Sequence, residues 1–227
     1  MRSTRWLAPL MLAAVVTQLA GVGIAEAGPV TNLRFAGRLA IAGWTTCPTP
    51  SAGQRCTDTE VIASQSSLKE KGFARSAGPR VIYRRFDYMV IDLGGGQLGY
   101  RTTRETIGGT DDATVSIQPR LERAAAAADV PVETCTFRAD GDTVCRSDTV
   151  AVHAWWTADG EIQRLDERAV NHAPGVLYKA YTKGWQRVAT AAATVAGAPV
   201  PGVLVPGLPP VLVSTRQGEM TVCHGGC

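Results

Sequence analysis

Apolar and polar residues alternate with a period of two through much of the chain, and Gly, Pro and Asp interrupt the alternating stretches. Successive side chains of a β-strand point to opposite faces, so this period predicts half-buried strands rather than helices. The early candidates are segments 33–44, 57–65, 79–93 and 98–106. Glycines at 94–96 predict a hairpin connection between the last two.

The later part of the chain alternates in the same way. The sequence DTVAVHAWWTADGEIQRLDE predicts a strand, a turn at Asp159-Gly160 and a second strand. A proline-rich linker is expected at 198–210. Further short strands are expected in three segments: 187–195, 211–215 and 218–223.

Segment 119–129 carries conflicting signals. Pro119 at a possible first helical position and five consecutive alanines favour a helix. Against this, Val115, Ile117, Leu121 and Ala125 continue a period of two without a change of phase. Because local propensity is weaker than tertiary context, we favour a strand.

Short strands at this spacing predict an all-β fold. The leading architecture is a two-sheet β-sandwich of short antiparallel strands with hairpins clipped by disulfides, and a β-barrel is the alternative. Residues 28–227 are expected to form a single domain, because their number is enough for one substantial core.

The first residues predict export. A basic start, an apolar run from Leu7 to Ile24 and the small-x-small sequence Ala25-Glu26-Ala27 indicate a signal peptide, residues 1–27, that is cleaved before Gly28. We therefore expect a secreted, extracellular protein that does not insert into a membrane. Removal of Arg2, Arg5 and Glu26 lowers the net charge from +3 to +2. So small a charge argues against a nucleic-acid partner.

Six cysteines follow the leader and fall into three close pairs. An even number in an exported chain indicates disulfides, and proximity favours nearest-neighbour pairing. The alternatives for the last pair are long-range pairing, or metal or redox use, but one close pair is too few for a structural zinc site. The expected bridges are Cys47–Cys56, Cys135–Cys145 and Cys223–Cys227.

The sequence contains no catalytic motif that we can assign. It lacks a Gly-x-Ser-x-Gly nucleophile elbow, and the glycines at 94–96 are not followed by the Lys-Ser/Thr of a phosphate loop. The histidines are His153, His172 and His224, and none has the spacing of a metal pair. We therefore name no catalytic residue, metal ligand or cofactor. An enzyme is the less favoured class, with a secreted hydrolase as the alternative.

His153 and Trp155 are the candidate binding residues. They share a strand face opposite the apolar Val150, Val152 and Ala154, so they are expected at the surface. An exposed Trp offers a flat amphipathic surface for stacking on a sugar or anchoring a protein. The alternative is that a neighbouring hairpin covers Trp155.

Arginines supply a weaker candidate. Arg80 and Arg84 share a strand face and Arg101 lies across the expected hairpin, which suggests a patch for polyanionic polymers. The alternative is an ordinary solvated face. Taken together, the sequence predicts an exported, non-enzymatic β protein that binds a cell-wall polymer or a secreted protein.

Overall fold

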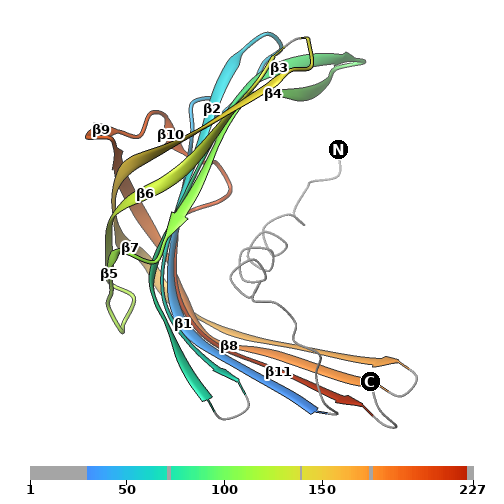
Figure 1. Ribbon diagram of the computed structural model, residues 1–227, viewed down its shortest axis with the longest axis vertical. Coiled ribbons are helices and arrows are strands. Elements are labelled where there is room, and N and C mark those ends of the chain that lie inside the picture. Colours follow the sequence, from blue (N-terminus) through green and yellow to red (C-terminus); the bar gives the residue numbers. More distant parts are fainter. Residues whose placement is uncertain (1–29, 71–72, 139, 174–175, 224–227) are drawn as a thin grey trace.

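The structure is a computed structural model that describes residues 30–70, 73–138, 140–173 and 176–223 (Figure 1). The described chain is almost entirely strand and turn. The strands are β1 (Val30–Thr45), β2 (Arg55–Glu70), β3 (Phe73–Gly94), β4 (Gln97–Thr110), β5 (Thr114–Ile117), β6 (Arg123–Phe137), β7 (Thr143–Ala173), β8 (Val176–Val195), β9 (Ala198–Pro199), β10 (Val203–Leu204) and β11 (Val211–Cys223). The predicted all-β class is therefore confirmed, and every strand pairing within these ranges is antiparallel.

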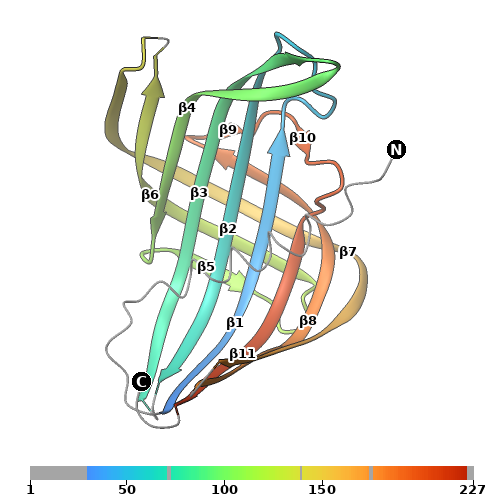
Figure 2. The ribbon, with the colours of Figure 1, turned by 90° about the vertical axis from the view of Figure 1, so that its right-hand side faces the viewer.

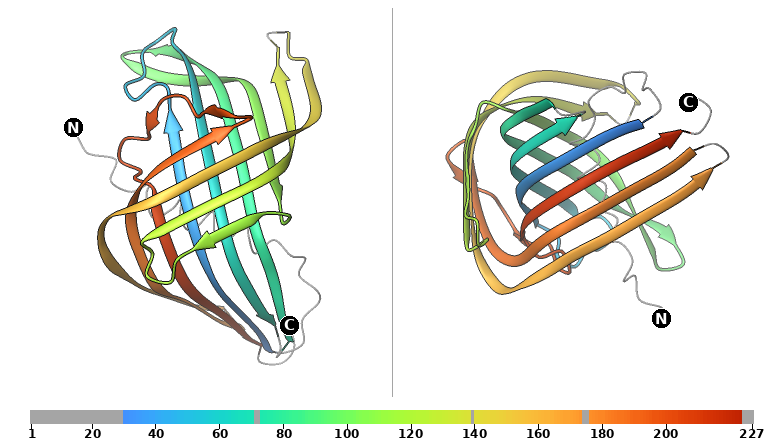
Figure 3. Two further views of the ribbon diagram at one scale, coloured as in Figure 1. Left: turned by 90° about the vertical axis from the view of Figure 1, so that its left-hand side faces the viewer. Right: turned by 90° about the horizontal axis from the view of Figure 1, so that it is seen from below.

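The described strands belong to one 11-stranded sheet whose pairings return to their starting point. β1 pairs with β11 on one side and with β2 on the other. The ring of pairings runs β1-β11-β8-β7-β6-β4-β3-β2 and back to β1. In two opposite views, β6 and β7 cross β1, β2 and β3 obliquely (Figures 2 and 3). Side chains of these two groups of strands can therefore meet between them.

The strands are longer than the sequence predicted. β7 spans 31 residues, and the predicted turn at Asp159-Gly160 is wrong. The pairing of β7 with β8 instead shifts register between Ala158 and Ile162, so that the extra residues form a bulge and the strand continues. Arg187 of β8 donates from its guanidinium to the Gly160 carbonyl and holds the bulge against its neighbour. The two strands expected at 211–215 and 218–223 are likewise one strand, β11.

Segment 119–129 is the ambiguous stretch, and the strand prediction is confirmed from Arg123 onward. The alanines lie in β6, which pairs with β5 on one edge and with β7 on the other. Two ladders of interstrand hydrogen bonds outweigh a helix propensity that amounts to only tenths of a kcal/mol per residue. A turn at 118–122 precedes β6, and Leu121 adopts a positive φ of 55° there.

The hydrophobic core collects one face of nearly every long strand. Val61 of β2, Val81 of β3, Val130 of β6, Val152 of β7 and Leu212 of β11 are excluded from water. The predicted core face of segment 148–156 is confirmed. The remaining buried members of this cluster are Ala40, Ala42, Trp44, Ala63, Tyr83, Val115, Ile117, Leu121, Ala124, Ala126, Val132, Ala154, Trp156, Ala189 and Ala193.

β5 closes one end of this core. The pairing of β4 with β6 ends at Gly108, and β5 pairs with the part of the same β6 edge that β4 does not cover. The side chains of Val115 and Ile117 on β5 are buried. Arg38 of β1 donates to the Ile117 carbonyl over 3.1 Å, and the Gln65 amide of β2 donates to the Val115 carbonyl. Side chains from the opposite group of strands therefore satisfy the free edge of β5.

Two of the three expected disulfides are confirmed. Cys47–Cys56 closes the loop between β1 and β2, where both cysteines pack with Val90. Cys135–Cys145 joins directly opposed residues of β6 and β7, with a Cα–Cα distance of 4.0 Å. The expected Cys223–Cys227 bridge cannot be compared with the structure because Cys227 lies outside the described residues, as does the signal peptide at 1–27.

Adjacent tryptophans on β7 provide a test of the predicted faces. Trp156 is 1% exposed in the core, whereas Trp155 is 47% exposed. We expect Trp156→Ala to lower the free energy of unfolding by about 3–5 kcal/mol, because it leaves a large cavity. Trp155→Ala should change it by only about 0.5 kcal/mol. Urea denaturation of both variants measures the difference, and equal losses would contradict the assignment of the two faces.

Gly108 tests the close contact between β4 and β6. A Cβ added there would lie 2.0 Å from the Pro131 carbonyl oxygen, which belongs to the backbone of β6 and cannot rotate away. We expect Gly108→Ala to destabilise the protein by at least about 1–3 kcal/mol. Gly78→Ala is the matched control, because open space surrounds its added Cβ. Thermal unfolding compares them, and a neutral Gly108→Ala would refute the proposed contact.

Candidate functional site

Trp155 and His153 lie on the outer face of β7, as predicted, and both are exposed. The direct cross-strand neighbours of Trp155 are Ala125 on β6 and Ala192 on β8. Alanine is too short to stand over the indole, so the alternative that a neighbouring hairpin covers Trp155 does not hold. His153 has equally short neighbours, Ala127 and Thr194. We call Trp155, His153 and these four neighbours the Trp155 platform.

The predicted arginine patch does not assemble. Arg84 pairs with Glu60 at 3.3 Å, and Arg80 pairs with Asp111 at 3.6 Å. Burial raises the pKa of the Glu60 carboxyl above its usual range, in spite of the opposing charge of Arg84. Arg101 lies on β4 opposite Met89, away from these pairs along the β3–β4 ladder. These arginines are part of local ion pairs and exposed strand surface.

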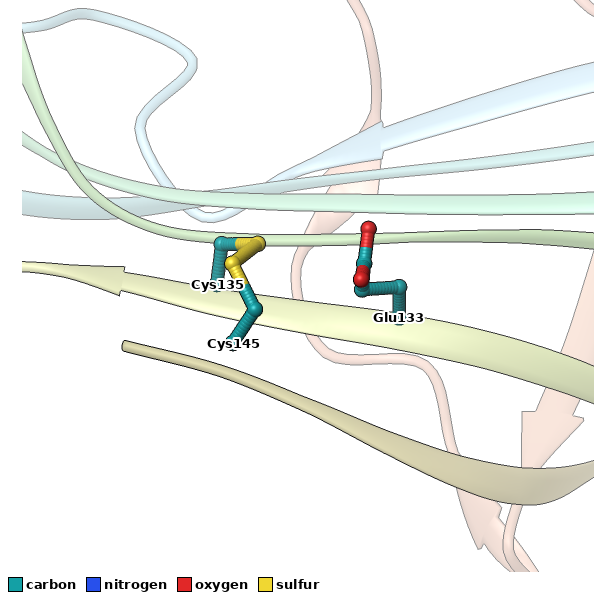
Figure 4. A group of neighbouring side chains, drawn as sticks. All are labelled: Glu133, Cys135 and Cys145. Carbon is teal, nitrogen blue, oxygen red and sulfur yellow. A yellow bond between two sulfur atoms is a disulfide. The ribbon is translucent and has the colours of Figure 1, made fainter. Parts of the chain in front are cut away.

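Among the described residues, one cluster has the residue types of a metal site. Glu133, Cys135 and Cys145 place their ligand atoms within 4.8 Å of one another (Figure 4). The two sulfurs are joined in a disulfide, so neither is the thiolate that a metal needs. In this oxidation state the cluster is a covalent clip with a neighbouring carboxylate.

A cavity of about 280 Å³ opens at the end of the ring opposite β5. Tyr83 and Arg85 of β3 and Arg104 of β4 line it together with Asp148 of β7. The turn after β8 covers one side of it. The other lining residues are Thr59, Thr106, Val132, Thr134, Val150, Val195, Ala196, Ala198, Pro199, Val200 and Pro201.

The cavity forms because inward-facing positions change from apolar to polar along several strands at the same level. On β2 the inward-facing residue changes from the apolar Val61 to the polar Thr59. On β7 it changes from the apolar Val150 to the charged Asp148. On β3, Tyr83 is followed two residues later by Arg85, which lies opposite Thr106 of β4. Polar side chains at this level line a space that hydrophobic residues would otherwise fill.

Ion pairing and burial set the electrostatics of this cavity. Arg85 binds the Asp87 carboxylate through Nε and Nη2, at 3.1 and 3.0 Å. Tyr83 is 3% exposed, and burial raises the pKa of its hydroxyl against the opposing charge of Arg85. The hydroxyls of Thr106 and Thr134 share a hydrogen bond of 3.0 Å. Tyr83 therefore stays a neutral hydroxyl at physiological pH.

Sequence reasoning missed the residues of this cavity. Each continues the parity of a core face, as Arg85 does after Val81 and Tyr83, and Asp148 does before Val150 and Val152 in the chain. A charged residue in phase with buried positions was the available signal. These residues lie around one cavity because the ring of pairings places their strands there. The local sequence pattern does not show which strands pair.

The cavity does not have the lining that would favour the hydrolase alternative. Its lining residues include one carboxylate, that of Asp148, and no histidine or serine. A glycosidase mechanism needs paired carboxylates, and a serine hydrolase mechanism needs a Ser-His pair.

Comparisons with known proteins identify no family. No family model matches the chain, and no curated protein matches it. A solved structure, the beta domain of the Bordetella autotransporter BrkA, is 11% identical, covering 87% of this chain and 100% of that one. Its TM-score of 0.13 does not support a shared fold. The part of the chain that the structure describes contains no helix long and apolar enough to cross a membrane.

Tyr83 gives the cavity a measurable pH dependence. Its pKa is higher in the folded state than the usual tyrosine value of 10.0. The folded chain therefore holds this proton more tightly than the unfolded chain, and ionisation above pH 10.0 costs stability. We expect the free energy of unfolding, relative to Tyr83→Phe, to fall as the pH rises through 10.0. Denaturation of both proteins below and above this pH measures it, and a constant difference would contradict the burial of the hydroxyl.

Proposed function

We propose that this chain is an exported, non-enzymatic protein that binds a polymer at the cell surface or in the medium through the Trp155 platform. The observation that carries the proposal is an indole that is 47% exposed between two alanines. An exposed indole offers a flat amphipathic surface on which a ligand can stack or a partner can be anchored.

The chemistry of the platform suits a carbohydrate. The C–H groups of a sugar ring can lie on the flat indole face, and the imidazole of His153 two residues away can exchange hydrogen bonds with hydroxyl groups. Alanine and threonine on both sides leave room for an extended chain to cross the strands. A protein partner would use the same indole as an anchor, but it would need a wider apolar surface than these short neighbours supply.

Two further features support export and the predicted layered architecture. Disulfides persist mainly in oxidising compartments, and the two confirmed bridges are in keeping with the predicted signal peptide.

We also propose that the ring of pairings is flattened into two facing walls, β1-β2-β3-β4 and β6-β7-β8-β11, which resemble the predicted sandwich. This is supported by a core that takes Val61 and Val81 from one wall and Val130 and Val152 from the other.

The test is retention of the purified protein on insoluble cellulose, chitin and bacterial cell walls. We expect retention on at least one of these, and at least about a tenfold weaker affinity for Trp155→Ala, because an aromatic anchor contributes roughly 2 kcal/mol or more. Trp185→Ala is the matched control. Trp185 is 51% exposed but lies opposite Arg164 and Ser214, away from the platform.

The outcomes separate the parts of the proposal. Equal retention of the wild type and Trp155→Ala would keep polymer binding but refute the platform as its site. An equal loss in both tryptophan variants would indicate general adsorption rather than a specific surface. No retention on any matrix would refute polymer binding.

A further inference from the structure

The cavity at the mouth of the ring is half open to solvent, and its charged residues Arg104 and Asp148 are exposed. The buried Tyr83 and Val132 lie on its inner side, and the turn between β8 and β9 covers another side. That turn is held by main-chain bonds: Ala196 N–H donates to the Ala151 carbonyl over 2.8 Å, and Val200 N–H to the Ala193 carbonyl over 3.0 Å. Pro199 and Pro201 further restrict it. The cavity is therefore preformed, which reduces the entropy lost on binding.

The charges lining the cavity are incompletely matched. The charge of Arg85 is balanced by Asp87. Arg104 and Asp148 remain, one cation and one anion, on strands β4 and β7 that are separated by β6. Within the described ranges, neither forms an ion pair with the other or with any other residue. Asp148 accepts a bond of 2.8 Å from the Thr149 N–H, which leaves most of its carboxylate lone pairs available.

Strand register explains why these two charges are held apart. Arg104 is opposite Thr136 on β6, whereas Asp148 is opposite Val132 on the same strand. The two residues therefore lie about four residues apart along β6 and two strand spacings apart across it, so that their Cα atoms are separated by roughly 16 Å. Opposite charges at this separation attract each other weakly across water, but a molecule with both charges can reach each of them.

We propose that this cavity binds a small zwitterion of amino-acid size, with its carboxylate on Arg104 and its ammonium group on Asp148. The guanidinium offers a planar pair of donors that matches a carboxylate, and the Asp148 carboxylate accepts hydrogen bonds from an ammonium group. The Tyr83 and Thr59 hydroxyls offer neutral hydrogen bonds between the two ends. A volume of about 280 Å³ suits a molecule of this class.

The site is distinct from the Trp155 platform, and its occupancy does not depend on polymer binding. Trp155 faces outward from β7, whereas Asp148 lies at the cavity on the same strand. Loss of one activity can therefore leave the other intact, and the variants below should not alter retention on a polymer.

The test is ligand-observed saturation-transfer NMR of the purified protein against the twenty common L-amino acids, with acetate and methylamine as probes of a single charge. We expect at least one amino acid to bind more tightly than either probe. Calorimetry with that amino acid should then show about tenfold weaker binding for Arg104→Gln and for Asp148→Asn, since each variant removes a charge-assisted hydrogen bond.

Matched controls remove one charge of each sign elsewhere. Arg120→Gln and Asp112→Asn alter exposed residues that do not line the cavity, and they should bind as the wild type does. Binding of acetate as tight as that of the amino acid would overturn the two-point model. So would amino-acid binding unaffected by both cavity variants, or no binding across the panel. These wild-type comparisons hold even if a variant folds poorly, which circular dichroism would reveal.

Discussion

The pairing of β1 with both β2 and β11 is the contact on which the rest of the structure depends. Without it, β1 and β2 would each present a long row of unpaired backbone groups to water or to another chain. With it, every strand in the ring has a hydrogen-bonded neighbour on each side along at least part of its length. Strands as long as β7 and β8 can then remain extended, because a neighbour continues to satisfy their hydrogen bonds.

Closure of the pairings gives the sheet an inside that must be filled. At the level of Val61, Val81 and Val152 it is filled with apolar side chains, and β5 closes the end beyond them. At the level of Arg85 and Thr106 the same inward positions are polar, and a cavity remains. Apolar packing and a polar cavity thus occupy successive levels of one interior. The apolar level supplies the burial that stabilises the fold, and the polar level supplies groups that a ligand can contact.

β7 shows how one strand can serve both the interior and the outer surface. Its inward residues change from Trp156 through Val152 to Asp148, while its outward residues include Trp155 and His153. The two faces are independent because successive side chains point in opposite directions. A substitution on the outer face therefore leaves the packing of the core unaltered to a first approximation.

Much of the local structure could be predicted from the alternation itself. The placement of Val152 inside and Trp155 outside follows from the geometry of a single strand, which needs no knowledge of its neighbours. The hairpin connection at Gly94–Gly96 could also be predicted, because these glycines adopt a positive φ that other residues avoid. Close spacing was also enough to predict Cys47–Cys56 and Cys135–Cys145.

Tertiary structure alone decided where the strands end and which of them meet. Asp159-Gly160 has the composition of a turn. Because β7 pairs with β8 on both sides of these residues, they form a bulge within β7 instead of ending the strand. The alanines of β6 have the composition of a helix, but two adjacent strands supplied their hydrogen bonds. Tyr83, Arg104 and Asp148 line one cavity because strand pairing places their strands around it. A local pattern determines the face on which a side chain lies, whereas long-range backbone pairing determines what it faces.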